Sequence, residues 1–97
     1  MQIERLKQKI GEDGFLLIDI REAYEYEDGS MASINIPLAD IMNNLDLLSP
    51  EKEIVIFCKS GKRSKSLKFM LKKMHNIKNI DHLEGGYLAW VEKEMTI

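Results

Sequence analysis

The sequence predicts an α/β fold with one mostly parallel central sheet of four or five strands, flanked by helices on both faces. Continuous apolar runs at residues 15–18 and 54–57 are typical of strands buried on both faces, as in a parallel sheet. Segments between and after these runs carry apolar residues at helical spacing. Because strands alternate with helices along the chain, we expect parallel strands joined by crossover helices.

Each predicted element follows from local signals. From Ser64 onward, for example, Leu67, Met70, Leu71 and Met74 recur at helical spacing, with lysines on the other face. Glycine and proline mark the breaks between elements. In chain order we predict a helix at residues 3–10, a strand at 15–18, a helix at 22–27, a strand at 34–36, a helix at 39–45, a strand at 54–57, a helix from residue 64, a strand at 79–83 and a helix at 87–93.

Length and composition predict one domain that spans residues 1–97. The chain has 97 residues, 44% of them hydrophobic, which suffices for one core and not for two. No stretch approaches the roughly 18 consecutive apolar residues of a membrane span, and residues 1–10 lack a signal-peptide core. A single cysteine cannot form an internal disulfide. We therefore expect a cytoplasmic protein without membrane contact.

Charge is distributed unevenly along the chain. The formal net charge of −2 predicts no general affinity for nucleic acid. Residues 59–73 contain seven basic and no acidic side chains, whereas the rest of the chain has seven basic and sixteen acidic ones, a formal charge of −9. The seven basic residues are Lys59, Lys62, Arg63, Lys65, Lys68, Lys72 and Lys73. Their local positive field favours anions, either small substrates or an acidic partner surface.

The one cysteine, Cys58, follows a predicted strand and precedes a basic loop that contains a glycine. A thiol becomes a good nucleophile when it ionises, and its pKa falls when cations, loop amides or a helix N-terminus face it. Gly61 permits several backbone N–H groups to converge on the sulfur, and Ser64 is placed to cap the following helix. The flanking cations are Lys59, Lys62 and Arg63. A lone cysteine at a strand end is most often a small buried hydrophobic residue, but this loop favours a functional thiol.

The loop at residues 58–64 resembles the active-site loop of the rhodanese (sulfurtransferase) family. Residues 17–22, 25–26 and 35–38 are similar to the family's first signature. Residues 83–90, with the sequence Leu-Glu-Gly-Gly-Tyr-Leu-Ala-Trp, are similar to its closing segment. The resemblance covers nearly the whole chain in the family's order, and it implies a rhodanese-like domain of the single-domain type.

Two departures from the family pattern lie outside the cysteine loop. The family usually has a Gly-His-Ile stretch and then Gly-Ala before its Asn-Ile-Pro segment. Residues 29–34, Gly-Ser-Met-Ala-Ser-Ile, are a residue shorter and lack the histidine and the second glycine. The usual opening strand is also not evident, since residues 1–3 run directly into a helical pattern. We expect this edge strand to be missing or reduced to a few residues.

The resemblance implies a persulfide relay, in which Cys58 takes a sulfane sulfur from a donor and passes it to a nucleophilic acceptor. The residues that would hold the anionic intermediate are Lys59, Ser60, Gly61, Lys62, Arg63 and Ser64. Expected donors are thiosulfate, a cysteine desulfurase persulfide or polysulfide. Expected acceptors are cyanide, a dithiol or the C-terminus of a small sulfur-carrier protein. No cofactor is expected, and no metal, because His75 and His82 lack metal-ligand spacing with the cysteine.

Three charged residues near the first strand are candidate supports for the cysteine loop. Asp19 and Arg21 stand at alternate positions and should therefore point to the same side. They either form a structural ion pair that braces the loop or contact the substrate. Glu25 is a candidate partner for Arg21.

Two other functions fit parts of this pattern. Cysteine-dependent phosphatases also hold a thiolate in a cationic loop after a strand, but they place five residues between cysteine and arginine. Here four residues separate Cys58 from Arg63. The smaller ring should fit a sulfur atom and exclude a tetrahedral oxyanion. The other alternative is a non-catalytic docking or regulatory module, although inactive rhodanese-like domains of that kind generally lack the cysteine that this chain keeps.

Overall fold

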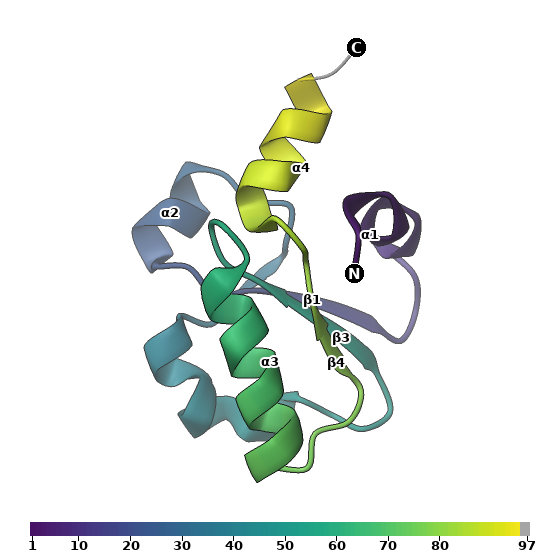
Figure 1. Cartoon of the computed structure of the whole chain (residues 1–97), viewed down its shortest axis with the longest axis vertical. Coiled ribbons are helices and arrows are strands. Elements are labelled where there is room, and N and C mark those ends of the chain that lie inside the picture. The colour runs from purple at the N-terminus through teal and green to yellow at the C-terminus, as the bar shows by residue number, and fades with distance from the viewer. Residues whose placement is uncertain (96–97) are drawn as a thin grey trace.

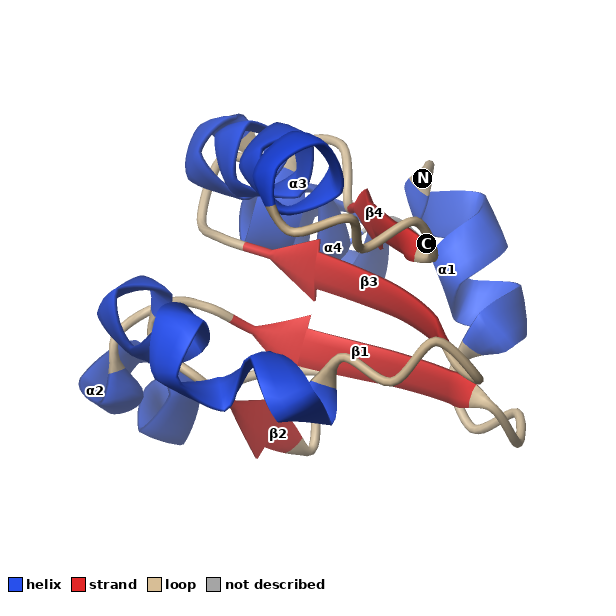
Figure 2. Cartoon of the chain, turned by 90° about the horizontal axis from the view of Figure 1, so that it is seen from below, coloured by secondary structure: helices blue, strands red, loops and turns tan. Residues whose placement is uncertain are grey.

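The computed structural model (Figure 1) describes residues 1–95, in which four parallel strands form one sheet in the order β2-β1-β3-β4 (Figure 2). The strands are β1 (Phe15–Asp19), β2 (Ile34–Asn35), β3 (Glu53–Phe57) and β4 (Ile80–His82). β1 and β3 lie at the centre and pair along their whole length, from Phe15 opposite Glu53 to Asp19 opposite Phe57. β1 pairs with β2 and β3, β3 pairs with β4, and each of these pairs is parallel. The predicted α/β fold class is therefore confirmed.

Helices cover both faces of the sheet, as predicted. They are α1 (Ile3–Lys9), α2 (Ala23–Asp28), the 3₁₀ helix η1 (Leu38–Leu47), α3 (Lys62–Met74) and α4 (Gly86–Met95). Residues of η1 and α3 share one buried cluster with the sheet, and residues of α1 and α4 share the other. Among residues 1–95, no helix has the length and apolar character needed to cross a membrane.

The two buried clusters explain why β3 is apolar throughout. Ile54 and Ile56 face the cluster that includes η1 and α3, whereas Val55 and Phe57 face the cluster that includes α1. All four side chains are completely buried. A strand covered on both faces gains from an apolar residue at every position, and each such side chain contributes about 1.5–3 kcal/mol of transfer free energy. This packing fixes the end of β3, from which Cys58 emerges.

The prediction that α3 begins at Ser64, with this serine as its cap, is wrong. α3 begins at Lys62, and its N-cap is Gly61, whose φ of 96° is left-handed. Ser64 is the third residue of the helix and is completely buried. Glycine adopts this backbone conformation without the steric cost of a Cβ atom, so the chain turns into the helix earlier than the serine indicated. The earlier start turns the first N–H groups of the helix towards Cys58.

Other predicted boundaries differ by a few residues. The helix expected at residues 39–45 is the longer η1, which has non-helical backbone angles at Asn44. The last strand is shorter than predicted, because β4 excludes Asn79 and Leu83. The last helix starts one residue earlier than predicted, at Gly86, and continues to Met95.

The opening edge strand is reduced to one residue, Met1, in line with the expectation from the sequence. The N-terminal nitrogen of Met1 donates to the carbonyl oxygen of His82 at 2.7 Å, and the Met1 carbonyl accepts the N–H of Glu84 at 2.9 Å. These bonds run along the outer edge of β4, and α1 begins at Ile3. The described part of the chain thus has no strand before β1, as the helical pattern near residue 3 indicated.

Candidate active site in the loop after β3

The carboxyl ends of β1 and β3 lie side by side, and their arrowheads point towards α2 in Figure 2. Ligands of open parallel sheets bind beyond these strand ends. A pocket of about 350 Å³ opens there, with Cys58 in its lining. The loop adds Lys59, Ser60, Lys62 and Arg63 to the lining, and the segment after β1 adds Arg21, Glu22 and Glu25. The structure therefore brings the cysteine loop together with two of the three charged residues considered as supports.

Hydrogen-bond donors converge on the sulfur of Cys58. The backbone nitrogen of Gly61 lies 3.1 Å from Sγ, and that of Ser64 lies 3.4 Å from it. The Ser64 hydroxyl oxygen is also 3.4 Å from Sγ. Only 5% of the cysteine is exposed, so little water competes with these contacts. The predicted convergence of loop amides is present, and the serine adds a side-chain contact.

These contacts set the acidity of the thiol. Burial raises the pKa of Cys58, but hydrogen bonds from the Ser64 hydroxyl and N–H lower it, as do those from the N–H groups of Gly61 and Arg63. The result is a pKa below the ordinary value for cysteine. The sequence also predicts that the charges of the basic side chains lower this pKa. In the structure the side chains of Lys59, Lys62 and Arg63 are exposed, and the donors in contact with the sulfur belong to the backbone and to a serine.

Alkylation should report this lowered pKa. The thiolate is the reactive form, so the rate of Cys58 modification by iodoacetamide should reach half its maximum below about pH 8.5, the value for a free cysteine. Intact mass is a clean readout because the chain has one cysteine. Ser64→Ala removes the hydroxyl contact and should move the midpoint to higher pH. A midpoint at or above the free value in the unmodified protein would mean that the thiol is not activated.

The turn before α4 packs against the cysteine loop, backbone against backbone. The N–H of Tyr87 donates to the carbonyl of Cys58 at 2.9 Å, and the N–H of Leu88 donates to that of Lys59 at 3.0 Å. Helix N-termini leave such N–H groups free for external acceptors. A Cβ atom on Gly86 would lie only 2.5 Å from the Cys58 carbonyl oxygen and 2.6 Å from that of Lys59. The close contact of the two segments therefore requires glycine at this position.

Asp19 and Arg21 form a buried ion pair. The guanidinium Nη2 and Nε lie 2.7 Å and 3.0 Å from the two carboxylate oxygens of Asp19. Nη2 also donates to the carbonyl of Gly29 at 2.6 Å, and the guanidinium carbon lies 4.0 Å from the ring centroid of Tyr87. The Asp19 carboxylate accepts the Ser30 hydroxyl at 2.9 Å. Of the two roles considered, this geometry fits the structural one, in which the pair joins β1, the segment after α2 and α4.

Glu25 lines the pocket and caps α2. Its carboxylate accepts the N–H of Glu22 at 3.2 Å, and the Glu22 side chain accepts the N–H of Glu25 in return. Burial lowers the pKa of Arg21, while Asp19 and then Glu25 raise it, and the net result is a raised pKa. Glu25 thus acts on Arg21 through its charge, whereas Asp19 is the partner in contact.

Asn35 holds the segment after β1, a role that the sequence does not predict. Its side-chain nitrogen donates to the backbone carbonyls of Asp19 and Arg21, at 2.9 Å and 3.0 Å. These two hydrogen bonds fix the backbone between the end of β1 and the pocket. Its only sequence signal was a place in the Asn-Ile-Pro segment, at residues 35–37, which says nothing about the bonding partners.

Comparisons with known proteins bear on the family and on the fold. A family model described as "Rhodanese-like domain" matches residues 2–93. The chain belongs to the rhodanese-like domain family. This rhodanese-like domain is 36% identical over 88 residues to "Putative sulfurtransferase YtwF" of Bacillus subtilis, with 88% of this chain and 82% of that protein covered.

Two further comparisons support the same assignment. "Putative thiosulfate sulfurtransferase, mitochondrial" of Schizosaccharomyces pombe is 30% identical over 101 residues, with 90% of this chain and 70% of that protein covered. The crystal structure of a rhodanese-related protein from Thermoplasma volcanium superposes with a TM-score of 0.83 at 30% identity, over 96% of this chain and 90% of that one. The family expected from the motifs is therefore confirmed, together with its fold.

Proposed function

We propose that this rhodanese-like domain is a sulfurtransferase in which Cys58 carries the transferred sulfur as a persulfide. The observation that supports this function best is the set of three contacts to the cysteine sulfur, from the N–H groups of Gly61 and Ser64 and from the Ser64 hydroxyl, none longer than 3.4 Å. Fixed donors around a buried sulfur stabilise an anion there without a partner base. The sulfurtransferase names of two relatives support the same reaction class.

In the first half-reaction, the Cys58 thiolate attacks the outer sulfur of thiosulfate. A bond forms between Sγ and this sulfur, the sulfur–sulfur bond of thiosulfate breaks, and sulfite leaves with the electron pair. The thiosulfate sulfurtransferase name of the fission yeast relative supports this small donor. The thiosulfate dianion is attracted by the exposed cations at the pocket rim, Lys59, Lys62 and Arg63. A protein persulfide would donate sulfur in the same way.

In the second half-reaction, an acceptor nucleophile attacks the outer sulfur of the Cys58 persulfide. Cyanide leaves as thiocyanate, a thiol leaves as a new persulfide, and Sγ takes the electron pair and returns to the thiolate. The cycle needs no cofactor and no external oxidant or reductant. We place it in the cytoplasm, where thiols stay reduced.

An intact-mass experiment tests this function. Incubation with thiosulfate should add the mass of one sulfur atom, and cyanide should then remove it with release of thiocyanate. A folded protein with an alkylatable Cys58 that gains no sulfur from thiosulfate would then be offered a protein persulfide from a desulfurase. Failure of both donors would favour the docking-module function.

Loop size separates sulfur transfer from phosphatase activity. With four residues between Cys58 and Arg63, the ring should be too small for a phosphate. We expect negligible hydrolysis of aryl phosphates under conditions in which thiosulfate is turned over. Insertion of one residue between Ser60 and Lys62 should weaken sulfur transfer and permit slow phosphate binding. Phosphatase activity of the unmodified chain, without a detectable persulfide, would contradict the proposed function.

A further inference from the structure

A groove of about 350 Å³ lies between η1 and α3, beside the Cys58 pocket. Leu38 of η1 and Leu67 and Met70 of α3 supply its apolar lining. The groove adjoins the pocket, because both are lined by Leu38, Lys62 and Arg63. A ligand that extends out of the pocket on this side therefore meets an apolar surface with cations at its entrance.

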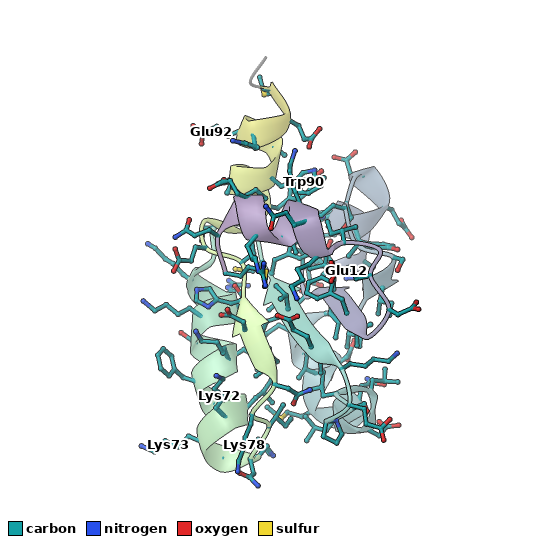
Figure 3. All side chains as sticks on the ribbon, turned by 90° about the vertical axis from the view of Figure 1, so that its right-hand side faces the viewer. Glu12, Lys72, Lys73, Lys78, Trp90 and Glu92 are labelled. Carbon is teal, nitrogen blue, oxygen red and sulfur yellow. The ribbon has the colours of Figure 1, made fainter. Side chains whose placement is uncertain are left out.

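Positive charge continues along α3 beyond the groove entrance. Lys65, Lys68, Lys72 and Lys73 follow on the same helix, and Figure 3 shows Lys72 and Lys73 at its end away from α4. Within residues 1–95, only Lys68 among the basic side chains of residues 59–73 forms a salt bridge, with Asp81 at 3.4 Å. Of the remaining cations, Lys62 and Arg63 line the groove and can attract an acidic partner there, whereas Lys65 lines a separate hollow with His82 and Glu84.

The opposite side of the pocket is less suitable for such a partner. A second hollow of about 420 Å³ opens there towards α2 and α4, and it shares Arg21, Glu25 and Lys59 with the pocket. Its lining includes the carboxylates of Glu25 and Asp28, and its arginine is already paired with Asp19. Like charges disfavour an acidic segment on this side, so the α3 side is preferred.

We infer that the groove binds the sulfur acceptor, an acidic protein segment that presents a reactive cysteine to Cys58 and places a neighbouring apolar side chain between η1 and α3. The inference rests on the proposed function and adds the acceptor class. Thiosulfate and cyanide occupy the pocket alone. A protein-borne cysteine brings its neighbours across the rim, where Leu67 and Met70 bind an apolar side chain and Lys62 and Arg63 bind carboxylates.

The transfer step balances without another reactant. The acceptor thiolate attacks the outer sulfur of the persulfide, and a sulfur–sulfur bond forms on the acceptor as the bond to Cys58 Sγ breaks. The electron pair of the broken bond stays on Sγ, which returns to the thiolate and to its contacts with Gly61 and Ser64. The sulfane sulfur keeps its oxidation state.

Binding of a short peptide tests the inference independently of turnover. The probe is rhodamine-labelled Glu-Glu-Leu-Ser-Glu, in which serine replaces the reactive cysteine, and fluorescence anisotropy gives its Kd. A peptide with lysine for glutamate should bind at least about tenfold more weakly at low salt, a difference of about 1.4 kcal/mol. A peptide with serine for leucine should also bind more weakly. The charge preference should shrink as salt increases.

Two matched variants locate the binding surface. Ser66→Glu adds one negative charge in the groove, and Phe69→Glu adds one on the same helix outside the groove lining. Both positions are exposed, so both variants should fold. Ser66→Glu should weaken binding of the acidic peptide and strengthen binding of the lysine peptide, whereas Phe69→Glu should keep the order of affinities of the unmodified protein.

Three results would overturn the inference: equal binding of the acidic and lysine peptides, equal effects of the two variants, or displacement of the acidic peptide by a short RNA whose binding also depends on Ser66. Thiosulfate-to-cyanide turnover is measured in parallel on the same samples. Turnover without peptide discrimination rejects the acceptor groove alone. Absence of a Cys58 persulfide with both thiosulfate and a desulfurase persulfide as donors rejects the proposed function and, with it, the role of the groove in sulfur transfer. The peptide result then decides only whether the groove binds an acidic segment.

Discussion

Replacement of Cys58 with serine should abolish sulfur transfer while the fold is retained. A hydroxyl is close in size to a thiol and fits the same three contacts from Gly61 and Ser64, but it cannot form a persulfide. Removal of an enzyme's nucleophile commonly costs three or more orders of magnitude in turnover, and we expect a loss of about a thousandfold or more. The measurement is thiocyanate formation from thiosulfate and cyanide, with circular dichroism and thermal unfolding as controls of the fold.

The composition of the chain makes this test decisive. Cys58 is the only cysteine, so no second thiol can carry sulfur in the variant. The intact mass of Cys58→Ser should remain unchanged after incubation with thiosulfate. Retention of most of the turnover in this variant would mean that the nucleophile is a different group and that the proposed persulfide is wrong.

Replacement of Gly86 with alanine should displace the cysteine loop, although Gly86 itself lies outside the loop. The added methyl would lie 2.5 Å from the Cys58 carbonyl oxygen and 2.8 Å from the Gly61 nitrogen, so the loop must move. Displacement of a reacting atom by about 1 Å can cost about a hundredfold in rate. We expect a loss of that size in kcat/KM for thiosulfate. The positive φ of 60° adds to the steric effect, and we expect a loss of about 2–4 kcal/mol in unfolding free energy.

Gly14→Ala is the matched control for this variant. Gly14 also has a positive φ, 79°, but no atom lies within 4 Å of an added Cβ. The Gly14→Ala variant should lose about 1–2 kcal/mol of unfolding free energy from backbone strain alone and keep its sulfur transfer activity. Chemical denaturation and steady-state kinetics on the two variants separate strain from loop displacement. Equal activity of the two variants would show that the contact between the α4 turn and the cysteine loop does not position the sulfur.

The order and type of the elements could be predicted because their signals are local. The run at residues 54–57 is apolar at every position, and such a run is stable only where both faces are covered. The spacing of Leu67 and Leu71 marked the buried face of a helix, and both residues are buried against the sheet in the structure. The positions of the strands around Cys58 follow from these patterns without knowledge of tertiary contacts.

The start of α3 and the surroundings of the loop could not be predicted in the same way. Gly61 caps the helix through a backbone angle that periodicity does not reveal, and this angle brings Ser64 to the sulfur. The contact of Gly86 with the loop joins residues far apart in the chain, so a local pattern shows only a turn there. Asn35 donates to the carbonyls of Asp19 and Arg21, and it comes close to them only when β1 and β2 pair.

The Ser64 hydroxyl has one proton and two neighbours that can accept it. Its oxygen lies 3.2 Å from the Gly61 carbonyl and 3.4 Å from the Cys58 sulfur. With a neutral thiol, the proton can point to the carbonyl while the oxygen accepts from the S–H group; with a thiolate, it turns towards the sulfur. When the charge of the sulfur changes, the Ser64 hydroxyl proton can therefore reorient by rotation about one side-chain bond, while the backbone amides keep their positions. The loop can follow the ionisation of its cysteine without moving its main chain.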